Sequence, residues 1–201
     1  MPQLDVDLSG ISLQNPVIMA SGTFGFGKEY KNLVPLARLG AITVKGISAS
    51  PCPGNPPPRI AEVSSGMLNA IGLQNPGIEA FISESDYLAA LRQLPVPVFV
   101  NIWGTSVQGY AQVAARLEEE GEGIAAIEIN ISCPNVEEGG MCFGTDPEMA
   151  AKVVKEVRAV TTKPLITKLS PNVTDISSLA EAVVDAGSDM VSLINTIPGM
   201  A

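Results

Sequence analysis

The 201-residue sequence contains no histidine, and this absence excludes several mechanisms at once. Histidine is the usual general base near neutral pH, the middle member of the serine-hydrolase triad and a common ligand of protein-bound zinc. Any proton transfer in this protein must therefore use cysteine, lysine, carboxylate or tyrosine side chains.

Clusters of positive charge and long apolar runs are also missing. The formal net charge is −9, and no run of lysine or arginine occurs, so neither nucleic acid nor an anionic membrane is an expected partner. No apolar run approaches the ~20 residues of a membrane-spanning helix, and residues 1–7 lack a signal-peptide pattern. Three cysteines without close pairing argue against a disulfide framework and favour the cytoplasm.

Metal binding is not expected either. Eight residues separate Cys133 from Cys142, and the chain has no histidine, so this pair is a weak metal signal. Aromatic residues make up only 4% of the chain, whereas 46% of the residues are apolar. This balance is typical of a tightly layered α/β protein, and the length fits one domain over residues 1–201.

Six short apolar runs, separated by helical patterns, predict six buried parallel strands. The runs cover residues 16–20, 41–44, 96–100, 127–130, 164–167 and 190–194. A β-hairpin over residues 4–13 precedes them. Helices are predicted over residues 30–39 and 78–91, after a cap at Thr105 or Ser106, and after Asp146 and Asp175. The proline-rich stretch within residues 50–77 is predicted to be an irregular binding loop.

Each predicted strand ends at a polar or cationic residue. These residues are Ser21, Lys45, Asn101, Asn130, Lys168 and Asn195. In a (β/α)8 TIM barrel such residues converge on one mouth. In a Rossmann sheet they would form a row behind a GxGxxG turn, and residues 21–27 do not match that motif in the required frame. The sequence therefore favours a barrel.

A mouth with two lysines and several asparagines can bind a flat, electron-accepting heterocycle, because cations stabilise the negative charge that develops on reduction. Cys133, just beyond Asn130, could accept a proton, although a thiol pKa of ~8.5 means that it needs help to act as a base at neutral pH. Simpler alternatives remain for single residues. The lysines could extend along apolar surface to solvent, the asparagines could form turns, and Cys133 could be a small buried apolar residue.

Several segments together resemble the class 1B dihydroorotate dehydrogenases. The matching segments are residues 20–27, 69–77, 130–135, Gly139-Gly140, 143–147 and 168–175. The resemblance runs from Leu4 to Gly199. Class 1B rather than class 1A is indicated by residues 69–73 and by Gly139-Gly140.

The resemblance implies FMN-dependent oxidation of dihydroorotate to orotate in pyrimidine synthesis. Cys133 would take the C5 proton while a hydride passes from C6 to flavin N5. The residues implied to contact FMN are Ser21, Lys45, Gly46, Asn101, Asn130, Lys168 and Ile194. Those implied to contact substrate are Lys45, Asn69, Ala70, Ile71, Gly72, Leu73, Asn130, Asn195 and Thr196.

The resemblance also implies a homodimer and a partner subunit that carries FAD and an iron–sulfur cluster and delivers electrons to NAD. Fumarate is the alternative acceptor. A complete barrel has eight βα units, and only about six are recognisable here, so we expect an incomplete barrel that lacks the last two. Two alternative functions follow: an inactive fragment that serves only as an interaction module, and a related flavin barrel that acts on another dihydropyrimidine.

Overall fold

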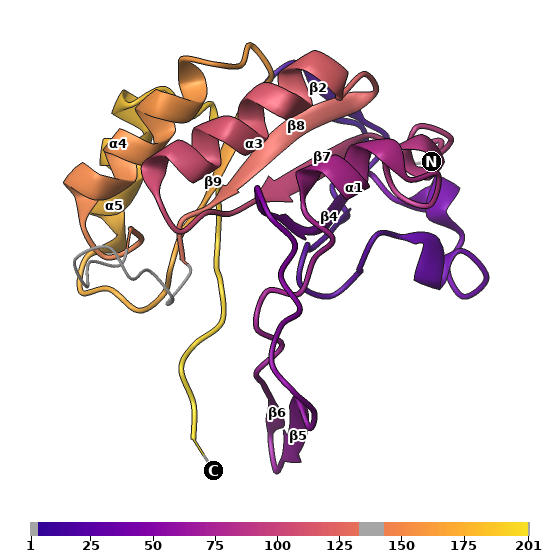
Figure 1. The fold of residues 1–201 in the computed structure, drawn as a ribbon, viewed down its shortest axis with the longest axis horizontal. Helices are drawn as coiled ribbons and strands as arrows, with labels where there is room; N and C mark the ends of the chain where they lie inside the picture. The colour runs from indigo at the N-terminus through magenta and orange to yellow at the C-terminus, as the bar shows by residue number, and fades with distance from the viewer. Residues whose placement is uncertain (1–3, 133–142, 201) are drawn as a thin grey trace.

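The computed structural model describes residues 4–132 and 143–200. Its centre is a six-stranded sheet in the order β10-β9-β8-β7-β4-β3, and every neighbouring pair is parallel. The strands are β3 (Ile18–Met19), β4 (Ala41–Ile47), β7 (Val98–Ile102), β8 (Ile124–Asn130), β9 (Leu165–Lys168) and β10 (Met190–Ser192). The sheet curls into a half-barrel (Figure 1). The predicted α/β class and the incomplete barrel are confirmed.

Helices pack on the convex face of this sheet (Figure 1). They are α1 (Ile78–Ser83), α2 (Leu88–Leu91), α3 (Val107–Glu120), α4 (Pro147–Arg158) and α5 (Ile176–Asp185). Three of them begin at a side-chain cap: Ser106 accepts from the Gly109 amide, Asp146 from the Glu148 and Met149 amides, and Asp175 from the Ser177 and Ser178 amides. These caps supply acceptors for amides that have no partner within the helix. Of the two caps predicted for α3, Ser106 is the correct one.

Two helix predictions were wrong in extent. Residues 30–39 form only two short 3₁₀ turns, η1 (Lys28–Tyr30) and η2 (Leu36–Arg38). Pro35 lies between them, and a proline lacks the amide donor and disfavours helical backbone in the residue before it. The helix predicted over residues 78–91 is divided into α1 and α2, because Glu84 has an extended backbone.

The amino ends of the barrel strands are closed by the predicted N-terminal hairpin. Strands β1 (Val6–Leu8) and β2 (Ile11–Leu13) pair antiparallel. Leu13 is buried in a small apolar cluster with Ala41, Phe99, Ala126 and Ile166. Because these four residues lie toward the amino ends of four sheet strands, this end of the concave face is apolar.

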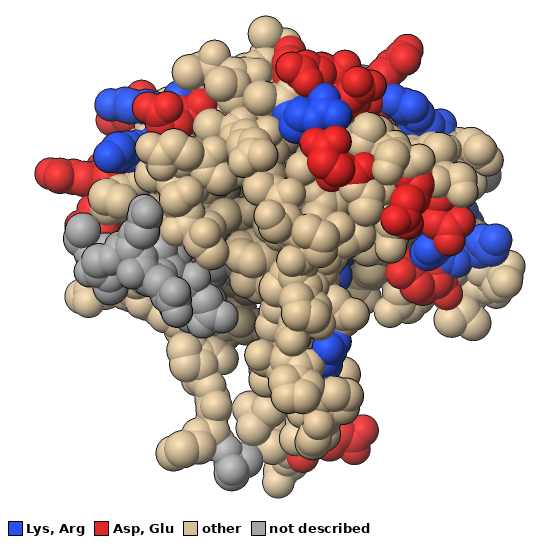
Figure 2. Space-filling view, in the orientation of Figure 1, with Lys and Arg blue, Asp and Glu red and all other residues tan. Residues whose placement is uncertain are grey.

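A second hairpin, which the sequence did not predict, lies within the proline-rich region. Strands β5 (Ile60–Val63) and β6 (Gly66–Asn69) pair antiparallel and project away from the sheet (Figure 1). The segment after β10 extends in the same direction, and Gly199 lies close to the Leu68 side chain. Charged side chains gather over the helices, whereas these two projections are mostly uncharged in this view (Figure 2). In the described ranges, no helix has the length and apolar character needed to cross a bilayer.

Glu118 on α3 makes hydrogen bonds whose contribution to the free energy of unfolding is expected to fall at acid pH. Its carboxylate accepts hydrogen bonds from the Thr161 and Thr162 hydroxyls, at 2.6 and 2.7 Å, in the segment before β9. These bonds lower the pKa of Glu118 to about 2. A depressed carboxyl pKa contributes stability that is complete above the ordinary pKa of ~4.5 and is lost as the pH falls from there toward 2.

We therefore expect Glu118→Gln to lower the free energy of unfolding by about 1 kcal/mol at pH 7, a value reduced for the partial exposure of the pair. Urea unfolding at pH 7, 5 and 3.5 checks this expectation. The difference between the two proteins should shrink at the lowest pH, because at pH 3.5 Glu118 takes up a proton in the unfolded chain but not in the folded protein. A difference that stays constant over this range would rule out the charged hydrogen bonds as its source.

Candidate active site

The concave face of the half-barrel becomes polar toward the carboxyl ends of its strands. On β8, Ile127 and Ile129 pack in the apolar layer under the helices, so the alternation of the strand turns Glu128 and Asn130 to the opposite, concave face. Lys168 on β9 pairs in register with both Asn130 and Ser192. Three neighbouring strands therefore place polar side chains on the same face.

A β-bulge places Lys45 and Gly46 together opposite Asn101. Val44 pairs with Val100 and Ile47 pairs with Ile102, so two residues of β4 face one residue of β7. Bulges re-aim side chains and are common next to active sites. A Cβ atom on Gly46 would lie 2.6 Å from Asn101 Oδ1 and 3.1 Å from Trp103 Cδ1. Only glycine fits this position without displacing its neighbours.

A buried carboxylate joins three strands at this level. Glu128 Oε2 accepts a 2.5 Å hydrogen bond from Asn101 Nδ2, and Oε1 accepts a 2.8 Å bond from the Ser192 hydroxyl. Glu128 is 6% exposed and Asn101 is 1% exposed. A buried carboxylate requires partners of this kind, because an unpaired one would lose its hydration without compensation.

Asn130 is the centre of a second group of contacts. Its Oδ1 atom accepts hydrogen bonds from Asn195 Nδ2 at 3.0 Å and from the Ser132 amide at 3.2 Å. Its backbone carbonyl accepts from the hydroxyl of Tyr110, which is fully buried on α3. The end of β8 is thus held from the helix side and from the segment after β10.

Lys45 is a half-buried cation whose charged form is destabilised. Burial lowers its pKa below the ordinary lysine value, and repulsion from the Arg59 guanidinium lowers it further. Arg59 is itself held by the proline-rich segment, since its side chain donates to the carbonyls of Asn55 and Pro53 and to the side chain of Gln74. Two cations therefore lie within electrostatic range of each other, an arrangement that an anionic ligand would stabilise.

Because burial and the Arg59 guanidinium disfavour the charged form of Lys45, we expect Lys45→Met to stabilise the ligand-free protein. A lysine pKa that is lower in the folded state means that the unfolded chain binds more protons between the two pKa values, so stability rises with pH in that range. The charged lysine is therefore unfavourable at neutral pH, and removing it should raise the denaturation midpoint. Lys31→Met, at an exposed site, is the matched control and should change the midpoint little. A lower midpoint for Lys45→Met would contradict the expectation.

The structure brings together many, but not all, of the residues singled out from the sequence. Lys45, Gly46, Asn101, Asn130, Lys168 and Asn195 lie at or just beyond the carboxyl ends of adjacent strands. Ser21 is buried just after β3. Ile194 is 44% exposed beyond β10, and Thr196 is exposed, with its carbonyl accepting from Asn172. Cys133 lies outside the described residues, as does Cys142.

The predicted substrate segment, residues 69–73, belongs to the projecting proline-rich region. Asn69 ends β6 and is exposed, whereas Ile71, Gly72 and Leu73 are half-buried. The segment is held by its own region: Ala70 and Ile71 carbonyls accept from Asn55, and the Gly72 carbonyl accepts from the Cys52 thiol. Among the described contacts, none joins this segment directly to Asn130 or Lys168. Its place beside the mouth remains a prediction.

Four residues of this site were missed in the sequence: Arg59, Trp103, Glu128 and Ser192. A usable signal existed for Glu128, since a charged residue inside the apolar run Ile127–Ile129 must be partnered if the strand is buried. Trp103, which follows β7, is 7% exposed, and its indole Nε1 is the only buried side-chain nitrogen or oxygen without a hydrogen-bond partner in the described part of the chain.

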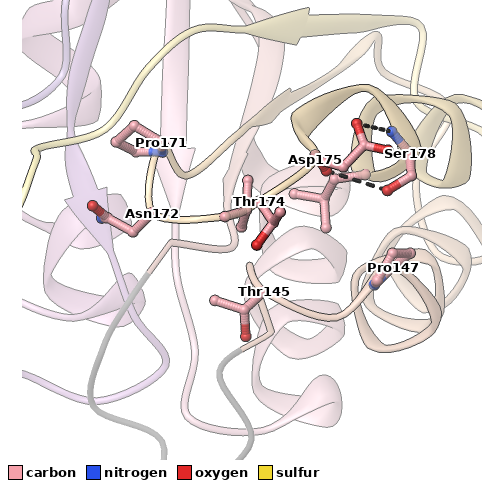
Figure 3. Close-up of a pocket in the computed structure, with 9 residues that line it drawn as sticks. Thr145, Pro147, Pro171, Asn172, Thr174, Asp175 and Ser178 are labelled. Carbon is pink, nitrogen blue, oxygen red and sulfur yellow. Dashed lines mark hydrogen bonds between the residues drawn. The ribbon is translucent and has the colours of Figure 1, made fainter.

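A separate cavity of about 490 Å³ lies between the N-terminal ends of α4 and α5 (Figure 3). It is lined by Thr145, Pro147, Pro171, Asn172, Val173, Thr174, Asp175, Ser178 and Leu179. The amides at both helix ends are already satisfied by Asp146 and Asp175. Since the lining includes none of the strand-end residues, we assign the site to the concave face and not to this cavity.

Comparison with known proteins gives one family. The sequence model described as dihydroorotate dehydrogenase matches residues 3–201. Curated relatives named dihydroorotate dehydrogenase B (NAD(+)), catalytic subunit, include proteins of Geotalea daltonii (56% identity over 200 residues) and Geobacter sulfurreducens (55%). Each alignment covers all of this chain and 65% of the relative, so the chain spans about two thirds of their length.

Solved structures show the same fold. A structure titled DHODH in complex with ferulenol, from Eimeria tenella, superposes with a TM-score of 0.79 at 19% identity, covering 100% of this chain and 61% of that one. The ligand-free DHODH of the same organism gives a TM-score of 0.77. At this identity the likeness supports the half-barrel architecture alone.

Proposed function

The chain belongs to the dihydroorotate dehydrogenase family, and on that premise we propose that it catalyses the FMN-dependent oxidation of dihydroorotate to orotate in pyrimidine synthesis. The observation that carries the proposal is the gathering of Lys45, Asn101, Asn130 and Lys168 on the concave face. Cations and amides on adjacent strands suit a flat ring that gains negative charge on reduction.

The residues present fit an FMN group. Gly46 lets the Asn101 side chain approach the bulge closely, and the indole ring of Trp103, whose N–H has no partner in the described structure, packs on the same side through Cδ1. The residues that would hold FMN are Ser21, Lys45, Gly46, Asn101, Asn130, Lys168 and Ile194. When bound, FMN supplies the hydride acceptor. Lys168 would stabilise negative charge at the ring edge, and Asn101 and Asn130 would fix the orientation of the ring through their carboxamides.

Substrate binding and proton transfer are assigned to neighbouring groups. Lys45, Asn130, Asn195 and Thr196 would hold the ring of dihydroorotate, and residues 69–73 (Asn69, Ala70, Ile71, Gly72 and Leu73) would hold its carboxylate from the other side. The positive charges of Lys45 and Arg59 favour that anion. Cys133 would accept the proton from C5 of the substrate while the hydride leaves C6.

The relatives' name, catalytic subunit with NAD(+), supports an electron-transfer partner. We propose a homodimer of this chain joined to a subunit that carries FAD and an iron–sulfur cluster, which passes electrons to NAD in the cytoplasm. Residues 4–132 and 143–200 contain no group of three side chains able to hold a metal ion. A cluster within the described part of this chain is therefore not part of the proposal.

The test compares substrates on the purified protein. A flavin absorption band near ~450 nm that is bleached anaerobically by dihydroorotate, and not by dihydrouracil, is the expected result. Bleaching by dihydrouracil alone would assign the chain to a different dihydropyrimidine. A colourless protein that takes up no added FMN would contradict the proposed function.

A further inference from the structure

Trp103 carries a buried hydrogen-bond donor that nothing in the described structure satisfies. Its side chain is 7% exposed and its Nε1 has no partner, although its backbone amide is bonded to the Ile47 carbonyl at 2.9 Å. An unsatisfied buried donor costs ~1–3 kcal/mol, so such a group calls for an explanation. The pyrrole edge of the indole faces Gly46, since Cδ1, the carbon bonded to Nε1, would lie 3.1 Å from a Cβ atom there.

An acceptor of fixed orientation lies on the same side of Gly46. Asn101 donates from Nδ2 to Glu128 Oε2, so this contact turns the NH₂ end of the carboxamide toward Glu128. The opposite end, Oδ1, is thereby turned toward Gly46, 2.6 Å from the position of a Cβ atom. Ser192 donates to the other carboxylate oxygen and holds Glu128 in place.

We propose that Trp103 Nε1–H and Asn101 Oδ1 form a paired donor and acceptor for an imide edge, and that Glu128 is the positioning residue that fixes the polarity of this pair. An imide presents a carbonyl acceptor next to an N–H donor, which complements an indole N–H next to an amide oxygen. Both the pyrimidine ring of FMN and dihydroorotate contain this edge. The inference rests on the proposed function and adds to it a tryptophan donor and a carboxylate that acts through Asn101.

Trp103 is the only tryptophan in the chain, so the indole N–H gives a single NMR cross-peak that reports on this contact. The apoprotein, labelled with ¹⁵N, is titrated with FMN in one arm and with orotate in the other. A new hydrogen bond should move the indole proton downfield and slow its exchange with solvent. A change in the FMN arm identifies the flavin as the bound imide, and a change only in the orotate arm identifies the substrate.

Variants separate the donor from the polarity of the acceptor. Trp103→Phe keeps the ring and removes the donor, and should weaken binding of the imide ligand by about 3- to 10-fold, the range for one neutral hydrogen bond. Glu128→Gln can still accept from Asn101 and should stay within about 3-fold of the wild type. Glu128→Leu frees the carboxamide to rotate and should weaken binding by about 10-fold or more.

Selectivity against FMN methylated at N3, which lacks the imide donor, tests the polarity of the pair. A purely structural role of Glu128 would leave this selectivity unchanged. The wild type should prefer FMN over this analogue, and Glu128→Leu should lose the preference while Glu128→Gln retains it. An indole peak that is unchanged in both arms while FMN binds would overturn the inference and leave the proposed function intact. Absence of any FMN uptake would overturn both.

Discussion

Replacing Cys133 by serine is expected to slow the reduction of bound flavin by dihydroorotate about 10²- to 10⁴-fold, the contribution typical of a positioned general base. The histidine-free sequence leaves few alternatives for this role. A thiol with a reference pKa of ~8.5 is far easier to deprotonate than an aliphatic hydroxyl. The variant should therefore keep FMN and substrate and lose mainly the proton-transfer step.

Anaerobic stopped-flow measurement of flavin bleaching checks this expectation. In the wild type the rate should rise with pH as the thiol ionises, and the serine variant should remain slow over the same range. Cys52→Ser is the matched control. The Cys52 thiol is half-buried and donates to the Gly72 carbonyl at 3.4 Å, a bond that a serine hydroxyl can also make. Flavin reduction at a near-normal rate in Cys133→Ser would remove this thiol from the mechanism.

Local sequence patterns predicted the sheet because most residues of its inner strands are buried. Runs such as Ala41–Val44 and Val98–Val100 are buried at every position and rich in β-branched residues, which is the signature of parallel strands covered on both sides. Helix caps were also predictable, since a serine or aspartate acts on amides two or three residues away. The polar residue at the end of each strand was predicted from the same patterns. Five strands of the sheet place such a residue at or near their carboxyl ends.

The contacts between these residues could not be predicted, because they depend on strand register. Asn101 meets two residues of β4 only because a bulge shifts the pairing between Val44 and Ile47. Glu128 accepts a hydrogen bond from Ser192, which is 64 residues further along the chain and lies on the other side of β9. Arg59 influences Lys45 through the fold of the proline-rich segment. None of these relations leaves a local periodicity in the sequence.

Replacing Gly46 by alanine is expected to weaken FMN binding about 10- to 100-fold and to destabilise the protein by about 1–3 kcal/mol, the usual cost of overpacking. The added methyl group would lie 2.6 Å from Asn101 Oδ1, inside any normal contact distance, and 3.1 Å from the Trp103 indole. Asn101 cannot move away freely, since Glu128 holds its NH₂ group at 2.5 Å. The clash should therefore distort the two groups proposed to bind the flavin.

Gly66→Ala provides the matched control, because a Cβ atom on Gly66 would have no heavy atom within 4 Å. It should leave FMN affinity unchanged and, by reducing the freedom of the unfolded chain, stabilise the protein slightly or not at all. FMN titration and urea unfolding of both variants measure the two effects. Equal affinities for Gly46→Ala and Gly66→Ala would place the flavin away from the bulge.

A second substitution distinguishes the clash from a general disturbance of β4. Asn101→Ser shortens the side chain that the new methyl group would meet, although it also removes a hydrogen-bond donor from Glu128. Gly46→Ala should therefore cost less free energy of unfolding in the Asn101→Ser background than in the wild type. The FMN affinity of the double variant Gly46→Ala/Asn101→Ser should nevertheless stay low, because the carboxamide that Glu128 orients is gone. Stability and cofactor binding would then respond differently at this pair of residues. A shorter side chain at position 101 relieves the clash, whereas the proposed flavin contact needs the carboxamide. Strictly additive destabilisation by the two changes would contradict a direct contact between Gly46 and Asn101.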